Sequence, residues 1–400
     1  MTLIKKVELH EFKFPVNNLG NLTGANSVGA FGYSKGEVSE LKKFAIKIIT
    51  DDGTVGEYVT HWCSTASTFA QSCMLAPKLL GRHAEEREGI YDDFKRELRQ
   101  FDHMGHGPID IALWDWFGKK YKCSVKNLLG GFKNKLPAYA STYHGDRNGG
   151  LDCKEAYADF AEKCFDIGYK AFKIHGWNEG NVKEEIGNIL HVAKKVGHKM
   201  TLMLDPACEL RTFADALAVG KACDEANYFW LEDPYRDSGV SAFGHKKLRS
   251  FIKTPILQTE HVRGVEPKAD FILAGGTDFL RMDPEYDMGI TGGMKIAHLA
   301  ESLGVDVEIH ACGPAHRIMM SAIRNTNYYE VALVGPDCDN AIPPVYLCGY
   351  SDMLDCVDEN GFVDVPDGEG LGVFYDWSYI YKNKTQFELS LIHISEPTRR

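Results

Sequence analysis

Eight short apolar runs, separated by helical stretches of roughly ten to fifteen residues, dominate the sequence from residue 136 onward. Near-continuous apolar strands that alternate with helices are typical of a parallel sheet covered on both faces. Eight such units predict an α/β fold with a (β/α)-barrel of the TIM type. The expected strands are PAYAST (137–142), AFKIHG (171–176), TLMLDP (201–206), YFWLEDP (228–234), PILQTEH (255–261), DFLRMDP (278–284), VDVEIHA (305–311) and YYEVALV (328–334).

The residues before the barrel follow a different pattern, in which strands come first and helices follow. Residues 3–16 and 43–59 alternate like strands, and the second stretch is predicted to contain a hairpin around Asp51–Gly53. Residues 67–100 and 108–122 have helical periodicity. This part of the chain is therefore predicted to be α+β.

Composition excludes several classes of partner. The chain has 400 residues and a net charge of −11, so it lacks the basic footprint of a nucleic-acid or anionic-membrane binder. No run approaches the roughly 20 apolar residues of a membrane span, and the first residues lack the apolar centre of a signal peptide. The 11 cysteines form no CxxC pair, which favours reduced thiols and a cytoplasmic location.

Three consecutive strands of the expected barrel end in the acidic residues Asp205, Glu232 and Glu260. The carboxyl ends of barrel strands meet at one mouth, where active sites lie. Three carboxylates in one pocket repel one another unless a cation lies between them. Mg²⁺ suits such oxygen ligands, and the lack of Cys or His in the set makes zinc less suitable. The alternative is that each carboxylate forms a separate ion pair or helix cap.

The next two strands end in Asp283 and His310. A carboxylate beside an imidazole holds the ring in one tautomer and raises its basicity, so this pair is a candidate general base. The alternative for His310 is a buried side chain that only satisfies a hydrogen bond.

Further candidates lie on the second and eighth strands. Lys173 and His175 are two residues apart, so both side chains are expected to face the mouth across from His310. Lys173 could act as an acid or base, or could bind a substrate carboxylate as a cation, and His175 could protonate a departing hydroxyl. Glu330 could be protonated and donate a hydrogen bond to an enolate oxygen. Ordinary strand-end roles are the alternatives for all three residues.

These groups together describe one reaction class. A base removes the proton next to the carboxylate of a bound acid, and the metal, Lys173 and Glu330 stabilise the enediolate that forms.

The chain resembles the mandelate racemase and muconate-lactonizing group of the enolase superfamily over nearly all of residues 1–388. The segment IDIALWDWFGKKYKCSVKNLLGG is similar to the helix that leads into the barrel in that group. The motifs that follow in the family's order are KIH, LDP, LEDP, QTE, RMDPEYDMGITGGMK, EIHACG and YYE.

The resemblance implies an architecture and a set of residue roles. It implies a (β/α)7β TIM-like barrel over residues 129–349, an N-terminal α+β capping domain over residues 1–128, and a segment over residues 350–388 that returns to the capping domain. Residues 389–400 continue no pattern, so they are expected to be a non-native tail and are left out of the predicted fold. The implied roles are Mg²⁺ on Asp205, Glu232 and Glu260, a His310–Asp283 dyad as general base, Glu330 as support for the intermediate, and Lys173 as the inner basic residue.

In the same family, two loops of the capping domain close the mouth and choose the substrate. Here these loops are expected at about residues 17–33 and 59–66, and the second contains His61 and Trp62, for which ordinary loop packing is the alternative. The first loop suits a polyhydroxy substrate, because it carries Asn17, Asn18, Asn21, Thr23, Asn26 and Ser27.

One departure from the family bears on the reaction. Many members carry Lys-x-Lys on the second strand, whereas this chain has Lys173 and His175. This pattern favours elimination over racemisation, so the sequence predicts a Mg²⁺-dependent dehydratase of a sugar acid, either an aldonate or an aldarate, that yields a 2-keto-3-deoxy acid. The small-molecule carboxylate is the expected partner, and a homo-oligomer is expected by resemblance.

Two alternatives stay open. One is a racemase, epimerase or lactone cycloisomerase on the same scaffold, and the other is a non-catalytic barrel used for binding or assembly. The particular acid sugar, and whether the elimination is syn or anti, depend on loop geometry that periodicity does not contain.

Overall fold

The computed structural model describes residues 2–21, 31–62, 66–145, 147, 149–336 and 342–391. None of the helices among these residues is long and apolar enough to cross a membrane.

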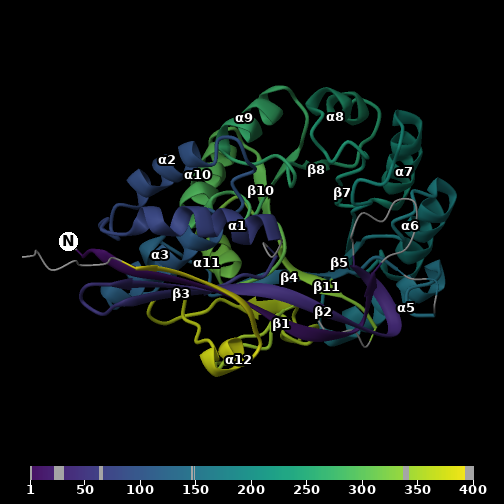
Figure 1. The fold of residues 1–400 in the computed structure, drawn as a ribbon. Coiled ribbons are helices and arrows are strands. Elements are labelled where there is room, and N and C mark those ends of the chain that lie inside the picture. The colour runs from purple at the N-terminus through teal and green to yellow at the C-terminus, as the bar shows by residue number, and fades with distance from the viewer. Residues whose placement is uncertain are drawn as a thin grey trace, which may run out of the picture.

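Eight parallel strands form the barrel sheet, in the order β10-β9-β8-β7-β6-β5-β4-β11. Their helices form an arc around the outside of the sheet (Figure 1). A hydrogen bond links the first and last strands of this order: the backbone N–H of Ala311, which follows β10, donates to Glu330 Oε2 of β11 at 2.6 Å. The strands are β4 (Lys135–Thr142), β5 (Ala171–Ile174), β6 (Thr201–Leu204), β7 (Trp230–Glu232), β8 (Ile256–Gln258), β9 (Phe279–Met282), β10 (Asp306–Ile309) and β11 (Tyr329–Val334).

The helices of the barrel follow their strands as expected. They are α5 (Lys154–Ile167), α6 (Val182–Val196), α7 (Phe213–Ala226), α8 (Ala242–Arg249), α9 (Val265–Leu273), α10 (Gly289–Ser302) and α11 (Pro314–Ala322). The eight predicted strands are therefore all present, and the prediction of a TIM-like barrel is confirmed.

A second, antiparallel sheet in the order β13-β1-β2-β3 lies along one side of the barrel. The long hairpin of β1 and β2 runs beneath the barrel in Figure 1. The distal half of β1 buries Phe12, Phe14 and Val16 and exposes the residues between them, as expected for a strand with one face on a core. The elements of this part are β1 (Ile4–Asn21), β2 (Phe31–Thr50), β3 (Val55–Val59), α1 (Ala66–Leu75), η1 (Ala76–Leu79), α2 (Arg87–Glu97), α3 (Gly107–Lys120) and α4 (Val125–Leu128).

The C-terminal segment crosses to both sheets. β12 (Phe362–Asp364) pairs with β4, and after α12 (Trp377–Lys382) the last strand, β13 (Lys384–Leu391), pairs with β1. Residues 389–391 were left out of the predicted fold. This exclusion is wrong, because Leu389, Ser390 and Leu391 of β13 pair with Glu8, Val7 and Lys6 of β1. Residues 392–400 lie outside the described residues.

Two other expectations need correction. The stretch over residues 17–33 was expected to be a loop, but residues 17–21 and 31–33 continue the paired strands β1 and β2, whose backbone hydrogen bonds outweigh the local Gly and Asn content. The expected helix over residues 67–100 is interrupted, because Pro77 is the second residue of a 3₁₀ turn that begins at Ala76 and Gly81 adopts a φ of +77°.

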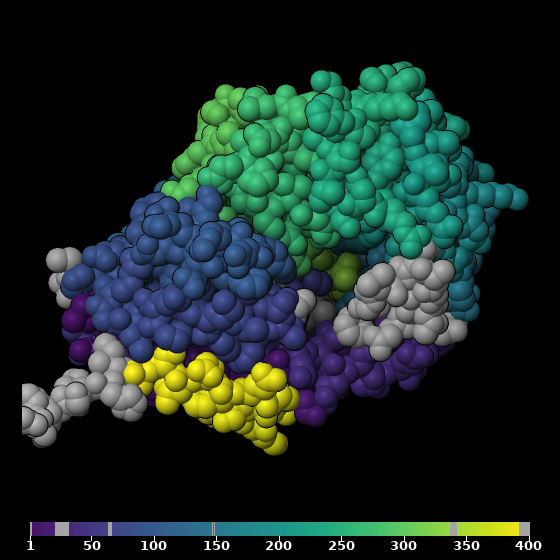
Figure 2. All heavy atoms as spheres, turned by 45° about the horizontal axis from the view of Figure 1, so that its top comes forward, coloured from purple at the N-terminus to yellow at the C-terminus, as the bar shows by residue number. Residues whose placement is uncertain are grey.

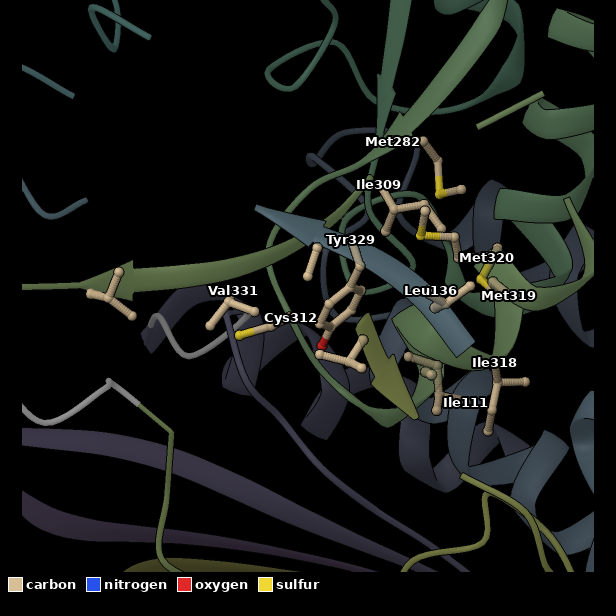
Figure 3. Packing of buried hydrophobic residues seen from close by; sticks show 14 of the residues in the cluster. Ile111, Leu136, Met282, Ile309, Cys312, Ile318, Met319, Met320, Tyr329 and Val331 are labelled. Carbon is tan, nitrogen blue, oxygen red and sulfur yellow. The ribbon is translucent and has the colours of Figure 1, made fainter. Parts of the chain in front are cut away.

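The two parts of the chain share one continuous hydrophobic core. Met282 of β9 and Ile309 of β10 belong to the same buried cluster as Met319 of α11, and the cluster extends to Ile111 of α3 (Figure 3). Helix α3 also contacts α10 through Asp110, which accepts hydrogen bonds from Thr291 N at 2.9 Å and Thr291 Oγ1 at 2.7 Å.

Gly56 sets how closely β3 approaches α3. A Cβ at this position would meet the carbonyl oxygen of Ala112 and the Cβ of Trp116 far inside van der Waals contact. We therefore expect Gly56→Ala to lower the free energy of unfolding by about 1–3 kcal/mol. The measurement is the urea midpoint.

Gly187 of α6 is the matched control, since the nearest atom to an added Cβ there is Lys154 Cδ at 4.0 Å. Gly187→Ala is expected to be neutral or to stabilise by up to about 1 kcal/mol, because Ala favours a helix interior. Equal effects of the two substitutions would contradict the proposed close approach.

Candidate active site

Inside the barrel, the polar residues of the site form a layer directly above a layer of buried apolar side chains, which we call the floor residues. Side chains two residues apart on a strand point the same way, so each floor residue is followed by an inward polar residue. On β5, β6 and β7, the floor residues Ala171, Met203 and Trp230 pack in one buried cluster. The residues two positions later are Lys173, Asp205 and Glu232. This alternation explains why the charged groups gather at one depth.

Lys173 lies at the centre of the site and is almost fully buried. Its Nζ is 3.2 Å from Asp205 Oδ2, 2.9 Å from Glu232 Oε2 and 2.9 Å from Glu330 Oε1. Burial acts to lower the pKa of Lys173, but Glu232 and Glu330 outweigh it and raise the pKa well above its ordinary value. Lys173 therefore remains a cation, which is one of the two states expected for it.

Arg281 is a second buried cation, which the sequence reasoning missed. Its Nε is 2.7 Å from Glu232 Oε1, and its Nη2 is 2.6 Å from Glu330 Oε2 and 3.2 Å from the hydroxyl of Tyr139. The sequence spacing could have identified Arg281. It lies on β9, two residues before Asp283, so both side chains are expected on the same inward face.

The two cations also change the expected state of Glu330. Burial acts to raise the pKa of this carboxyl, but Lys173 and Arg281 hold it well below its usual range. The contacts with Lys173 and Arg281 therefore favour the ionised carboxylate over the protonated form that the sequence suggested for Glu330. Glu330 is an ionised acceptor that also receives the backbone N–H of Ala311.

His310 and Asp283 form a direct pair. His310 Nδ1 is 2.7 Å from Asp283 Oδ2, and His310 Nε2 is 3.4 Å from Glu260 Oε1. Burial acts to lower the pKa of His310, but the charge of Glu260 and the contact with Asp283 outweigh it and leave the pKa raised. A third residue, His316 of α11, lies with its Nε2 3.3 Å from Asp283 Oδ1. Asp283 therefore lies between two imidazole rings, with one carboxylate oxygen near each.

The carboxylates proposed to hold a metal are only partly gathered. Single ligand atoms of Glu232, Asp233 and Glu260 lie within 4.8 Å of one another. Asp205 is not in this group, because its Oδ2 contacts Lys173 and also His175 Nε2, at 3.1 Å. Asp233 was not a sequence candidate, although it directly follows Glu232.

The group nevertheless has the properties of a dication site. Burial raises the pKa of Glu232 to about 7, and it raises that of Asp233 well above its usual range, with further increases from Glu260 and Asp205. Asp233 Oδ1 is buried and has no hydrogen-bond partner among the described residues. Buried oxygen atoms of this kind are stabilised when a hard cation such as Mg²⁺ lies among them, so the residues present fit that ion.

One cavity of about 470 Å³ collects these groups, with His175, Asp205, Glu260, His310 and Glu330 in its wall. The molecular surface is hollowed where the blue part of the capping domain meets the green and teal part of the barrel (Figure 2). The remaining polar wall residues include His144, Asn178, Glu209, Arg236 and Ser238.

The expected closing loops contribute unequally to this cavity. Trp62 lies in its wall, and its ring centroid is 6.1 Å from that of His310. His61 is buried instead, and its Nε2 is hydrogen-bonded to the hydroxyl of Tyr346. In the first expected loop, Asn17 and Asn18 belong to β1, and Asn21 ends that strand. Thr23, Asn26 and Ser27 of this loop lie outside the described residues. Residues 63–65 of the second expected loop also lie outside them.

The curated proteins to which the chain is similar include dehydratases and a racemase. The chain is 24% identical over 340 residues to arabinonate dehydratase of Saccharolobus solfataricus, which covers 82% of this chain and 87% of that protein. It is 25% identical over 316 residues to N-succinyl-L-Arg/Lys racemase of Bacillus cereus, covering 76% of this chain and 79% of that protein.

A solved structure of D-glucarate dehydratase from Agrobacterium tumefaciens, complexed with magnesium, superposes with a TM-score of 0.83 at 28% identity and covers 96% of this chain and 99% of that one. Residues 156–379 match the family described as enolase C-terminal domain-like, and residues 27–130 match the mandelate racemase / muconate lactonizing enzyme N-terminal domain. The chain belongs to the mandelate racemase and muconate lactonizing enzyme family of the enolase superfamily.

Proposed function

We propose that this protein is a Mg²⁺-dependent dehydratase of a sugar acid, an aldonate or aldarate, which it converts to a 2-keto-3-deoxy acid. The observation that carries the proposal is the His310–Asp283 pair, 2.7 Å apart, whose His310 shares a cavity wall with His175 and Glu330. The buried Lys173 Nζ lies 2.9 Å from Glu330 Oε1. Dehydratases among the relatives support the substrate class.

His310 is the proposed base. In the neutral tautomer whose Nδ1–H donates to Asp283, Nε2 can take the proton from the carbon next to the substrate carboxylate. Asp283 Oδ1 accepts the backbone N–H of Glu285 at 2.7 Å, which keeps the carboxylate aligned with the ring. Loss of the neighbouring hydroxyl as water leaves an enol, which tautomerises to the 2-keto product.

Three other residues have proposed roles in this reaction. His175 protonates the departing hydroxyl, and its Nε2 lies 3.1 Å from Asp205 Oδ2. The Lys173 ammonium faces the negative charge that develops on the substrate oxygens, and Glu330 fixes the ammonium in place at 2.9 Å.

We propose that Asp205, Glu232 and Glu260 hold the Mg²⁺ ion, with Asp233 beside them. When bound, such an ion supplies Lewis-acid charge for the carboxylate of the substrate. The polar wall of the cavity suits the hydroxyl groups of a sugar acid, since Asn178, Ser238 and His144 can each exchange hydrogen bonds with them.

Racemisation or cycloisomerisation on the same scaffold is the second candidate, because relatives with those names match at 25% and 28% identity. Racemisation needs a second base on the opposite face of the same carbon. Lys173 is a poor base while three carboxylates surround its ammonium, and this favours dehydration.

Replacing the proposed base tests the reaction directly. His310→Asn is expected to lower kcat for dehydration by about 10²–10⁴-fold, because it removes the proton acceptor. The measurement is keto-acid formation, by carbonyl trapping, from a library of mono- and diacid sugars. His298→Asn, at an exposed position on α10, is the matched control and should keep full activity. Full activity of His310→Asn would exclude it as the base.

Deuterium exchange separates dehydration from racemisation. In D₂O, we expect a keto acid to accumulate from the substrate. Incorporation of deuterium at the α-carbon without accumulation of a keto acid would favour the second candidate. NMR of the reaction mixture reads both outcomes in one sample.

Mg²⁺ removal and carboxylate substitutions test the proposed metal ligands. Chelation should abolish activity, and Asp205→Asn and Glu260→Gln should each weaken Mg²⁺ binding more than about tenfold by calorimetry, since even outer-shell changes cost 10–100-fold. Glu266→Gln on α9, which is exposed, is the control. If Asp233→Asn abolished binding while Asp205→Asn retained it, the ligands would be Glu232, Asp233 and Glu260.

A further inference from the structure

A buried carboxylate joins the capping domain to the barrel next to the proposed base. Glu285 lies in the turn between β9 and α10 and is fully buried. Its Oε1 accepts hydrogen bonds from the hydroxyl of Tyr58 at 2.6 Å and from the backbone N–H of His61 at 2.7 Å. Its Oε2 accepts the backbone N–H of Trp62 at 2.7 Å. All three donors belong to the end of β3 and the segment that follows it.

The same residue is bonded to the dyad through its backbone. The N–H of Glu285 donates to Asp283 Oδ1 at 2.7 Å, while Asp283 Oδ2 is 2.7 Å from His310 Nδ1. The next residue, Tyr286, stacks on the imidazole of His310 with centroids 5.2 Å apart and an interplanar angle of 27°. Displacement of Glu285 would therefore move both the orienting carboxylate and the ring that covers the base.

Trp62 closes this arrangement from the other domain. Its ring meets the His310 ring nearly edge-on, at an interplanar angle of 69°, and forms part of the cavity wall. His310 thus lies between a stacked Tyr286 from the barrel and an edge-on Trp62 from the capping domain. The carboxylate of Glu285 binds the backbone of Trp62, so it sets the distance between these two contacts.

We propose that Glu285 is a positioning residue that fixes the capping segment 58–62 against the barrel and, through Asp283, holds His310 in its working position. A carboxylate suits this role because it offers acceptors only and can receive several N–H and O–H donors at once. The catalytic part of this inference rests on the proposed role of His310, whereas the part that concerns the segment does not.

Glu285→Gln tests the proposal. The substitution replaces one acceptor oxygen with an NH₂ donor, so either Trp62 N–H or the Tyr58 and His61 donors lose their partner. We expect the amide protons of His61 and Trp62 to exchange with solvent at least about tenfold faster in the resting protein, measured by mass spectrometry of short peptides. We also expect kcat to fall by about 10²-fold together with a rise in KM, since misplacement of about 1 Å has effects of that size.

Asp115→Asn is the matched control. Asp115 of α3 is also a buried carboxylate that accepts backbone N–H groups, from Glu57 at 2.7 Å and Leu371 at 2.9 Å. It acts on the earlier part of β3 and on the C-terminal segment. We expect this variant to be less stable, but to leave exchange at His61 and Trp62, and both kcat and KM, within about threefold of the unmodified protein.

Tyr58→Phe provides a graded variant that also serves if Glu285→Gln does not fold. It removes one of the three donors, so its effects on exchange and on kcat should lie between those of the unmodified protein and Glu285→Gln. Unchanged exchange at His61 and Trp62 in the folded variants would overturn the proposal, as would a loss of kcat no larger than that of Asp115→Asn. Exchange is measured without substrate. Faster exchange at His61 and Trp62 in Glu285→Gln, combined with full activity of His310→Asn, would therefore refute the proposed role of His310 as base but not the contact of Glu285 with segment 58–62.

Discussion

Neutralisation of buried carboxylates by two permanent cations is the interaction on which the rest of the site depends. Lys173 and Arg281 both contact Glu232 and Glu330, and Lys173 also contacts Asp205. Removing a charge from water costs several kcal/mol unless a partner compensates it. These contacts hold the pKa of Glu330 and of Asp205 below the usual range, whereas burial still raises the pKa of Glu232 and of Asp233, an effect that a bound dication would oppose.

Strand geometry places these charged residues at one depth in the barrel, because each follows an apolar floor residue by two positions. The floor residues are buried beneath the charged layer, and Asp205, Glu260, His310 and Glu330 of that layer line the cavity. Within that layer, the proposed base and the ammonium of Lys173 occupy separate groups: His310 contacts Glu260 and Asp283, and Lys173 contacts Asp205, Glu232 and Glu330. A proton acceptor in the cavity wall and a fixed positive charge next to Glu330 can therefore lie in one site without mutual neutralisation.

The N-terminal part of the chain contributes directly to the cavity as well as packing against the barrel. Trp62 supplies part of the wall, and the bonds of its backbone to Glu285 tie that wall to the turn that carries Asp283. The continuous core between α3 and the barrel keeps the two parts together, as the pair of Asp110 and Thr291 illustrates. Precise placement of an aromatic ring beside a base thus depends on packing far from the reacting atoms.

The sequence by itself determined the barrel strands and the residues at their ends, because apolar runs and a period of two are local properties of a chain. It also indicated the neighbouring positions of Asp283 and His310, which end consecutive strands. Only the tertiary structure decided the pairing of Arg281, the ionised state of Glu330 and the three donors of Glu285. These features depend on distances between residues far apart in the chain. Local periodicity identifies the face of the strand on which a side chain lies, but not the residue that it contacts there.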